Sequence, residues 1–102
     1  MLSAASELFS EKDLAQAVSI LRAIAHPLRM QLLDYIAHNR NTNVNKIYNT
    51  LKLEQSVTSQ HLKVLRDAGL VITERQGKFI YYSVNYALLA AIEKSVNEFL
   101  AS

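Results

Sequence analysis

Apolar side chains recur along this chain at helical spacing in five separate stretches. In the first stretch they follow one another at intervals of four, three and four residues, which places them on one face of an amphipathic helix. Proline is well tolerated in the first turn of a helix, so Pro27 is expected to begin the second. The pattern predicts helices over about 11–25, from Pro27 to a polar loop at 38–43, over 44–52, over 55–68 and over about 86–101.

The period changes from helical to extended after Gly69, which is expected to cap the preceding helix. Residues 70–75 and 79–84 are rich in β-branched and aromatic side chains, and residues 76–78 between them are typical of a hairpin turn. The predicted fold class is therefore mainly α with a β-hairpin, in the order α-α-α-α-β-β-α. We expect a single domain over residues 1–102.

The 102 residues include no cysteine, which excludes disulfide frameworks, thiolate nucleophiles and thiolate metal sites. The sequence also lacks a glycine-rich phosphate loop and a His–carboxylate set, so no enzyme is expected. No apolar stretch approaches the roughly 20 residues that a membrane-spanning helix needs, and the first 25 residues do not resemble a signal peptide. We expect a cytoplasmic protein with no membrane association, no cofactor and no bound metal.

The net charge of +2 is unevenly distributed along the chain. Residues 26–78 carry eight Lys and Arg against four Asp and Glu, a balance of +4. The segments on either side, 1–25 and 79–102, each carry −1. A basic centre between slightly acidic ends favours a polyanionic partner for the centre.

Two of the predicted helices, 44–52 and 55–68, are joined by only a few residues around Leu53 and Glu54, which is typical of a helix-turn-helix. The second of these helices has two distinct faces. The inward face carries Thr58, Leu62 and Leu65, and the hydroxyl of Thr58 needs a backbone acceptor there. The outward face carries short hydrogen-bonding groups and a cation that can reach base edges and phosphates: Ser56, Ser59, Gln60 and Lys63.

The predicted hairpin provides a second basic surface. Its tip carries Arg75, Gln76 and Lys78 around Gly77. Two cations on a two-stranded arm can contact phosphates that flank the recognition helix or enter the minor groove.

Four segments together resemble the winged helix-turn-helix repressors of the ArsR/SmtB family, and the resemblance covers nearly the whole chain. They are His26-Pro27-Leu28-Arg29, the run from Gln55 to Val71, Arg75-Gln76-Gly77-Lys78 and Tyr81-Tyr82-Ser83. The resemblance implies a homodimer whose two recognition helices enter successive major grooves of a near-palindromic operator in double-stranded DNA. It adds Gln55 to the base-reading positions, and it implies that His61 makes either a structural contact or a phosphate contact.

The resemblance also implies that the first and last helices form the dimer interface. The last helix supports this, because its six large apolar side chains exceed what one face can bury in so small a domain. The expected interface residues are Leu14, Val18, Leu21, Leu88, Leu89, Ile92, Val96 and Phe99.

Many members of the family sense metals or oxidants, so the resemblance implies positions for such sites in this sequence. The family's Cys-Val-Cys thiolate site aligns with Asn43-Val44-Asn45, and neutral amides do not replace thiolates for a soft metal. The second common metal site, in the last helix, aligns near Tyr86, Leu88 and Phe99, and that helix contains no histidine. We therefore expect a member without the family's known metal and thiol sites.

The leading hypothesis is a sequence-specific, dimeric transcriptional repressor. The alternative is a winged-helix protein–protein interaction module that no longer reads DNA. The sequence does not identify an effector: a small molecule, a metal at a new site, a protein competitor and control by abundance all remain open. The operator sequence is not predicted either, because DNA shape contributes to recognition.

Overall fold

The structure, a computed structural model, describes residues 11–101 without the side chains of residues 11–14 and 99. The order of its elements confirms the predicted fold class and adds one short strand. The elements are α2 (Glu11–Ile24), α3 (Pro27–His38), β1 (Thr42–Asn43), α4 (Val44–Leu51), α5 (Gln55–Asp67), β2 (Val71–Gln76), β3 (Phe79–Val84) and α6 (Tyr86–Ala101).

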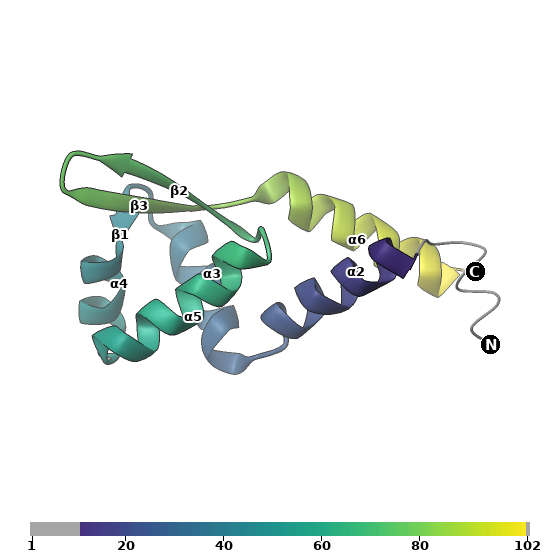
Figure 1. The fold of residues 1–102 in the computed structure, drawn as a ribbon, viewed down its shortest axis with the longest axis horizontal. Coiled ribbons are helices and arrows are strands. Elements are labelled where there is room, and N and C mark those ends of the chain that lie inside the picture. Colours follow the sequence, from purple (N-terminus) through teal and green to yellow (C-terminus); the bar gives the residue numbers. More distant parts are fainter. Residues whose placement is uncertain (1–10, 102) are drawn as a thin grey trace.

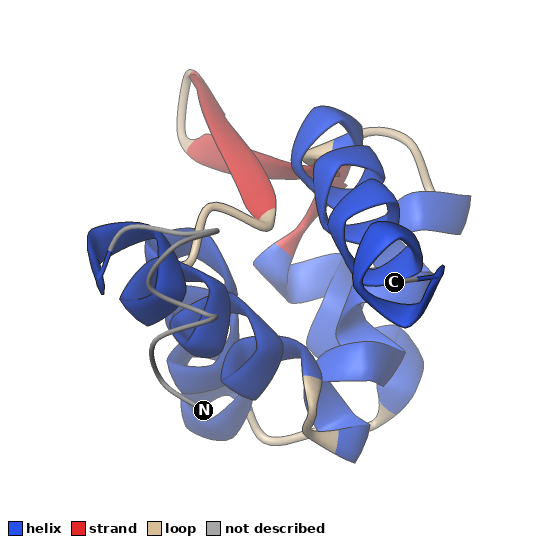
Figure 2. Ribbon diagram, turned by 90° about the vertical axis from the view of Figure 1, so that its right-hand side faces the viewer, coloured by secondary structure: helices blue, strands red, loops and turns tan. Residues whose placement is uncertain are grey.

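The molecule has two parts, visible in Figure 1. Residues 27–84, from α3 to β3, form what we call the body. The helices α2 and α6, which we call the arm, extend from the body in the same direction and give the molecule extents of 48 × 22 × 22 Å. Seen from the free end of the arm, α2 and α6 lie apart from each other (Figure 2).

The hydrophobic core lies in the body and at its junction with α2. Its fully buried large apolar side chains come from α3, α4, α5 and the segment that leads into β2: Leu32, Ile47, Leu62, Leu65 and Leu70. Ile20 and Ala23 in the second half of α2 join this core. The C-terminal half of α2 is therefore fixed to the body.

The sheet has three antiparallel strands in the order β1-β3-β2. The strand β1 corrects the prediction that residues 38–43 form a loop throughout, because Thr42 and Asn43 pair with Tyr82 and Tyr81 of β3. Two residues are too few to show the alternation that identifies a strand in a sequence. The same segment contains Asn41 at φ 54°, a left-handed conformation that asparagine tolerates.

Within the described part of the chain, no helix combines the length and hydropathy needed to cross a membrane.

Candidate nucleic-acid interface

The turn between α4 and α5 fixes the direction of the candidate recognition helix. Lys52 ends α4 in the left-handed region, at φ 56° and ψ 49°. The amide of Leu53 then donates to the carbonyl of Tyr48 over 2.9 Å, which closes the end of α4. Because only three residues separate α4 from α5, the two helices meet at a sharp angle and form the predicted helix-turn-helix.

The inward face of α5 is as predicted. Thr58, Leu62 and Leu65 are buried against the body. The Thr58 hydroxyl donates to the carbonyl of Glu54 over 2.8 Å, so the expected backbone acceptor is present. This bond satisfies a polar group that would otherwise destabilise the core.

The outward face of α5 is polar and exposed. Within the described part of the chain, its five side chains have no hydrogen-bond or ion-pair partner: Gln55, Ser56, Ser59, Gln60 and Lys63. These groups donate and accept the hydrogen bonds that base edges and phosphates offer in a major groove. Their contact with DNA stays a prediction.

The C-terminus of α5 leads directly into the hairpin through the predicted glycine cap. Gly69 adopts φ 81°. Its amide donates to the carbonyl of Arg66, and the amide of Leu70 donates to the carbonyl of Leu65, each over 2.9 Å. This pair of bonds is a Schellman motif, which satisfies the last carbonyls of α5 and turns the chain into β2.

The hairpin of β2 and β3 projects from the body as an exposed wing. Gln76 pairs with Phe79, so Gly77 and Lys78 form a two-residue turn. Gly77 supplies the positive φ, 63°, that the first position of a type II′ turn requires. The predicted tip residues Arg75, Gln76 and Lys78 are all exposed. The wing can therefore present its cations to a phosphate backbone.

His61 differs from the other residues predicted on the recognition helix. Its ring is partly buried and lies 4.7 Å, centroid to centroid, from the ring of His26. Its Nδ1 lies 3.2 Å from the guanidinium nitrogen Nη1 of Arg29. Burial, followed by the positive charge of His26 and Arg29, lowers the pKa of His61 below its ordinary value of 6.5. These contacts favour the structural role for His61 over the phosphate contact.

Arg29 is the residue at this site that the sequence reasoning missed. It is partly buried on α3, where its Nε and Nη2 donate to the carbonyls of Ala23 and Arg22 over 2.6 and 3.1 Å. Its position three residues before Leu32 and seven before Ile36 places it on the buried stripe of α3. A charged side chain on an apolar stripe indicates that it has hydrogen-bond partners inside the protein. The sequence therefore contained a signal for the role of Arg29.

His26 is the N-cap of α3. Its backbone is extended, and its Nδ1 accepts a hydrogen bond from the amide of Leu28 over 3.1 Å. Because Nδ1 accepts this bond, the neutral ring carries its proton on Nε2.

The arm exposes apolar side chains that the body does not cover. Leu88, Leu89 and Ile92, in the first half of α6, pack partly against the core. Val18 and Leu21 on α2 are 45% and 47% exposed, and Val96 and Leu100 on α6 are 40% and 75% exposed. The side chains of Leu14 and Phe99 lie outside the described residues.

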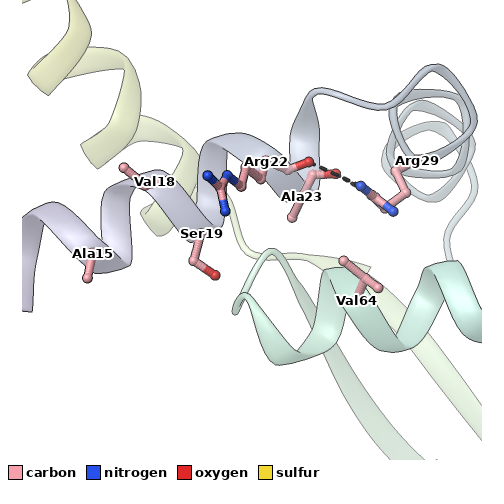
Figure 3. A pocket seen from close by; sticks show the side chains of 7 residues that line it. All are labelled: Ala15, Val18, Ser19, Arg22, Ala23, Arg29 and Val64. Carbon is pink, nitrogen blue, oxygen red and sulfur yellow. Dashed lines mark hydrogen bonds between the residues drawn. The ribbon is translucent and has the colours of Figure 1, made fainter.

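Two hollows are lined by several residues of α2. A groove of about 410 Å³ runs between α2 and α6 and is lined by apolar side chains such as Ile20, Leu88 and Ile92. A second hollow, of about 580 Å³, lies between α2, α3 and α5 (Figure 3). Figure 3 also shows the guanidinium of Arg29 turned toward the end of α2. Both hollows are large enough for a small molecule.

Comparison with known proteins identifies the family. Residues 26–73 match the family described as bacterial regulatory proteins of the arsR family. Transcriptional repressor PagR of Bacillus anthracis is 38% identical to this chain over 86 residues, which are 83% of this chain and 85% of PagR. The chain belongs to the arsR family.

Solved structures of arsR-type proteins share the fold. The crystal structure of PagR superposes with a TM-score of 0.69 at 34% identity, over 83% of this chain and 97% of that one. An ArsR-like transcriptional regulator from Rhodococcus sp. RHA1 gives a TM-score of 0.81 at 20% identity, over 88% and 84% of the two chains. At that identity the likeness concerns the fold alone.

Another relative of this chain is named as an activator. Transcriptional activator HlyU of Vibrio cholerae is 37% identical over 75 residues, which are 74% of this chain and 68% of HlyU. As an arsR-family protein, this chain is a DNA-binding transcriptional regulator and not an enzyme.

Two of the residues at the positions where the family resemblance implies metal sites make other hydrogen bonds in this structure. The Asn43 side chain is already used as the N-cap of α4, because its Oδ1 accepts from the amide of Lys46 over 3.0 Å. Tyr86, at the other position, has its hydroxyl 3.4 Å from the carbonyl of Ala37, to which it donates. Among the described residues, no three His, Cys, Asp or Glu side chains group together in a way that could hold a metal ion.

Proposed function

We propose that this arsR-family regulator is a homodimeric repressor that binds a near-palindromic operator, with α5 in the major groove and the wing beside it. One observation carries the proposal: the outward face of α5 is exposed and its polar side chains have no partner within the described residues. Hydrogen-bonding groups on the exposed face of a helix that is packed into the body are suited to read base edges.

The distribution of charge supports the same orientation. Lys63 on α5 and Arg75 and Lys78 on the wing are all exposed. They belong to the segment 26–78, which carries the net charge of +4. Cations placed around a base-reading face neutralise phosphates, and the release of counterions makes such binding weaken steeply as salt increases.

The arm supports a homodimer. Val18, Leu21, Val96 and Leu100 leave apolar area exposed on both helices. The groove between α2 and α6 adds a concave apolar surface next to it. A second copy of the chain would cover these surfaces symmetrically and would place two recognition helices on successive major grooves, about 34 Å apart.

We also propose that this regulator lacks the family's known metal and thiol sensing sites. The chain has no cysteine, and Asn43 is committed to capping α4. Equilibrium dialysis against zinc and copper tests this directly. We expect no tight binding, and one tightly bound ion per subunit would contradict the proposal.

The central experiment is selection of preferred duplexes from random DNA, followed by affinity measurements between about 50 and 200 mM salt. We expect an inverted repeat whose half-sites are about 10 base pairs apart, bound with a strong dependence on salt. Selection that yields no sequence preferred over random DNA would favour the interaction module, the alternative function.

Substitution of the reading face separates the two functions more sharply. The double variant Ser59→Ala and Gln60→Ala should lose roughly tenfold or more in affinity for the selected duplex and remain dimeric, because each lost base contact costs about 1–3 kcal/mol. Gln31→Ala, on an exposed part of α3, is the matched control and should bind normally. Normal binding by the double variant would show that α5 does not read the operator.

A promoter reporter tests the direction of regulation. With the selected operator placed across a promoter, expression of the protein should lower transcription, because a bound dimer blocks the polymerase. The Ser59→Ala and Gln60→Ala variant is the control and should leave transcription unchanged. An increase with the wild-type protein would show an activator, the function that the name of HlyU states for that relative.

A further inference from the structure

One side chain connects the arm, the body and the recognition helix. Arg29 belongs to α3, and its guanidinium donates to the carbonyls of Ala23 and Arg22 in the last turn of α2. The third contact of the same guanidinium is with Nδ1 of His61 on α5. These are direct contacts of 2.6, 3.1 and 3.2 Å.

Each contact has a clear physical role. The carbonyls at the end of α2 have no partner within their own helix, and they carry the negative end of the helix dipole. A planar guanidinium fixes the directions of its donors, so bonds from one Arg to two helices restrict how those helices turn relative to each other. The side chain of Arg29 is therefore a rigid connection between α2 and α5.

The connection requires a particular protonation state of His61. A guanidinium can only donate hydrogen bonds, so Nδ1 of His61 must carry a lone pair and accept. The titratable and charged groups that face His61 are Arg29 and the ring of His26, both from the start of α3, whereas α2 offers backbone carbonyls to Arg29. A proton on Nδ1 would remove the acceptor and place a second cation beside the guanidinium of Arg29.

We propose that Arg29 is a positioning residue that sets the orientation of α5 relative to α2, and thereby aligns the two DNA-reading faces of the dimer. The proposal rests on the proposed function, because it assumes that α2 lies in the dimer interface and that α5 reads the operator. In this proposal His61 contacts Arg29 and does not contact the DNA.

A consequence is that acid should weaken both folding and operator binding. The pKa of His61 is lowered in the folded protein. The stabilisation from neutral His61 is therefore complete above pH 6.5 and is lost as the pH falls through the lowered pKa. Added positive charge alone would strengthen DNA binding. A loss of affinity on acidification would therefore indicate that the contact between Arg29 and His61 had been broken.

The first experiment measures affinity for the duplex selected from random DNA at about pH 7.5, below the melting temperature of every variant. Arg29→Ala should lose roughly tenfold, because hydrogen bonds from a charged group are strong, and it should remain dimeric. Arg22→Ala is the matched control: Arg22 contributes only its carbonyl to the connection, so its affinity should stay within about twofold. Equal losses in both variants would indicate a general effect of charge and would overturn the proposal.

A second pair of variants tests His61 and keeps the proposal falsifiable if Arg29→Ala does not fold. His61→Asn places an acceptor oxygen near the position of Nδ1 and cannot titrate, so it should keep near wild-type affinity. His61→Ala should lose affinity as Arg29→Ala does. In the wild type, affinity should fall from about pH 7.5 to about pH 5.5, and in His61→Asn it should change less. Equal pH profiles would contradict the proposal.

A double-variant cycle separates positioning from direct contact with DNA. If His61 acts through Arg29, the variant Arg29→Ala with His61→Ala should bind no more weakly than Arg29→Ala alone. Additive losses would show that His61 contacts DNA independently and would overturn the assignment.

A measurement without DNA distinguishes failure of this proposal from failure of the proposed function. The ¹⁵N chemical shift of His61 Nδ1, recorded by NMR during a pH titration, should show an unprotonated acceptor that takes up a proton at lower pH than in an unfolded peptide. Arg29→Ala should shift that titration and Arg22→Ala should not. An unchanged titration in Arg29→Ala would refute the connection even if the protein binds its operator as proposed.

Discussion

The body and the arm use the same apolar residue types with opposite outcomes. In the body, Leu32, Ile47, Leu62 and Leu65 are completely buried. In the arm, Leu21, Val96 and Leu100 remain 40–75% exposed although they lie on regular helices. The difference shows that helical periodicity alone does not tell whether an apolar stripe faces the core of its own chain.

The reason is geometric. Helices α3, α4 and α5 and the start of β2 surround a common centre, so each covers the apolar face of the others. Among the described side chains, those of α6 that pack against this centre are Leu88, Leu89 and Ile92, all in the first half of the helix. Its stripe continues past the edge of the body. The core therefore lies mainly in the body, and the arm keeps the exposed apolar surface that the proposed dimer would cover.

The largest expected effect comes from a cavity in the body. Leu65→Ala removes a completely buried side chain and should lower the free energy of unfolding by about 2–5 kcal/mol. Met30→Ala, at an exposed position on α3 of the same body, should change it by no more than about 0.5 kcal/mol. Guanidinium denaturation followed by circular dichroism measures both. Equal losses would show that the body is not the stabilising part.

Substitutions in the arm should affect assembly and not the fold. Leu21→Asp together with Val96→Asp should raise the dissociation constant of the dimer roughly 30-fold or more, since charges would be buried at the centre of the interface. Sedimentation equilibrium measures this constant. The helical circular dichroism spectrum should be unchanged, and the dependence of the melting temperature on concentration should disappear. A dimer unaffected by both aspartates would place the interface elsewhere.

The junction between body and arm depends on Asn85. Its Oδ1 accepts from the amide of Leu88 over 3.2 Å, which caps α6, and its Nδ2 donates to the carbonyl of Gly69 over 2.8 Å. Asn85→Ala should lower the free energy of unfolding by about 1–2 kcal/mol through loss of the cap and of this bond. Asn97→Ala, at an exposed position of the same helix, is the control in thermal unfolding. A similar effect in both variants would contradict a specific role for the junction.

The smallest effect concerns two buried threonines of the body. Thr58 donates to the carbonyl of Glu54, whereas Oγ1 of Thr42 has no hydrogen-bond partner among the described residues. Thr58→Val should therefore destabilise the protein by about 1 kcal/mol, and Thr42→Val should be neutral or stabilising by up to about 1 kcal/mol. Urea denaturation of the two variants side by side tests the opposite signs, and destabilisation by Thr42→Val would show a bond that the structure lacks.

Much of the helix-turn-helix is predictable from the sequence because its signals are local. The inward positions of α5, Thr58, Leu62 and Leu65, follow from spacing within one helix, and the structure confirms them. The cap at Gly69 and the N-cap at His26 are equally local, since each involves neighbours within a few residues. The bounds of the predicted helices differ from the structure by at most one residue.

The strand β1 and the contacts of Arg29 were not predictable in the same way. Thr42 pairs with Tyr82, a residue far along the chain, and two residues carry no periodic signal of their own. The position of Arg29 on an apolar stripe indicated an internal partner but not which one.

The sequence by itself determined which residues form each helix and which face of α5 is polar, because both depend on the spacing of residues within a single helix. Only the tertiary structure decided that Arg29 lies between the end of α2 and His61, and that the apolar stripe of α6 extends beyond the body. Those contacts join residues as far as 32 positions apart. Their geometry depends on how the helices cross, and local periodicity contains no information about that crossing.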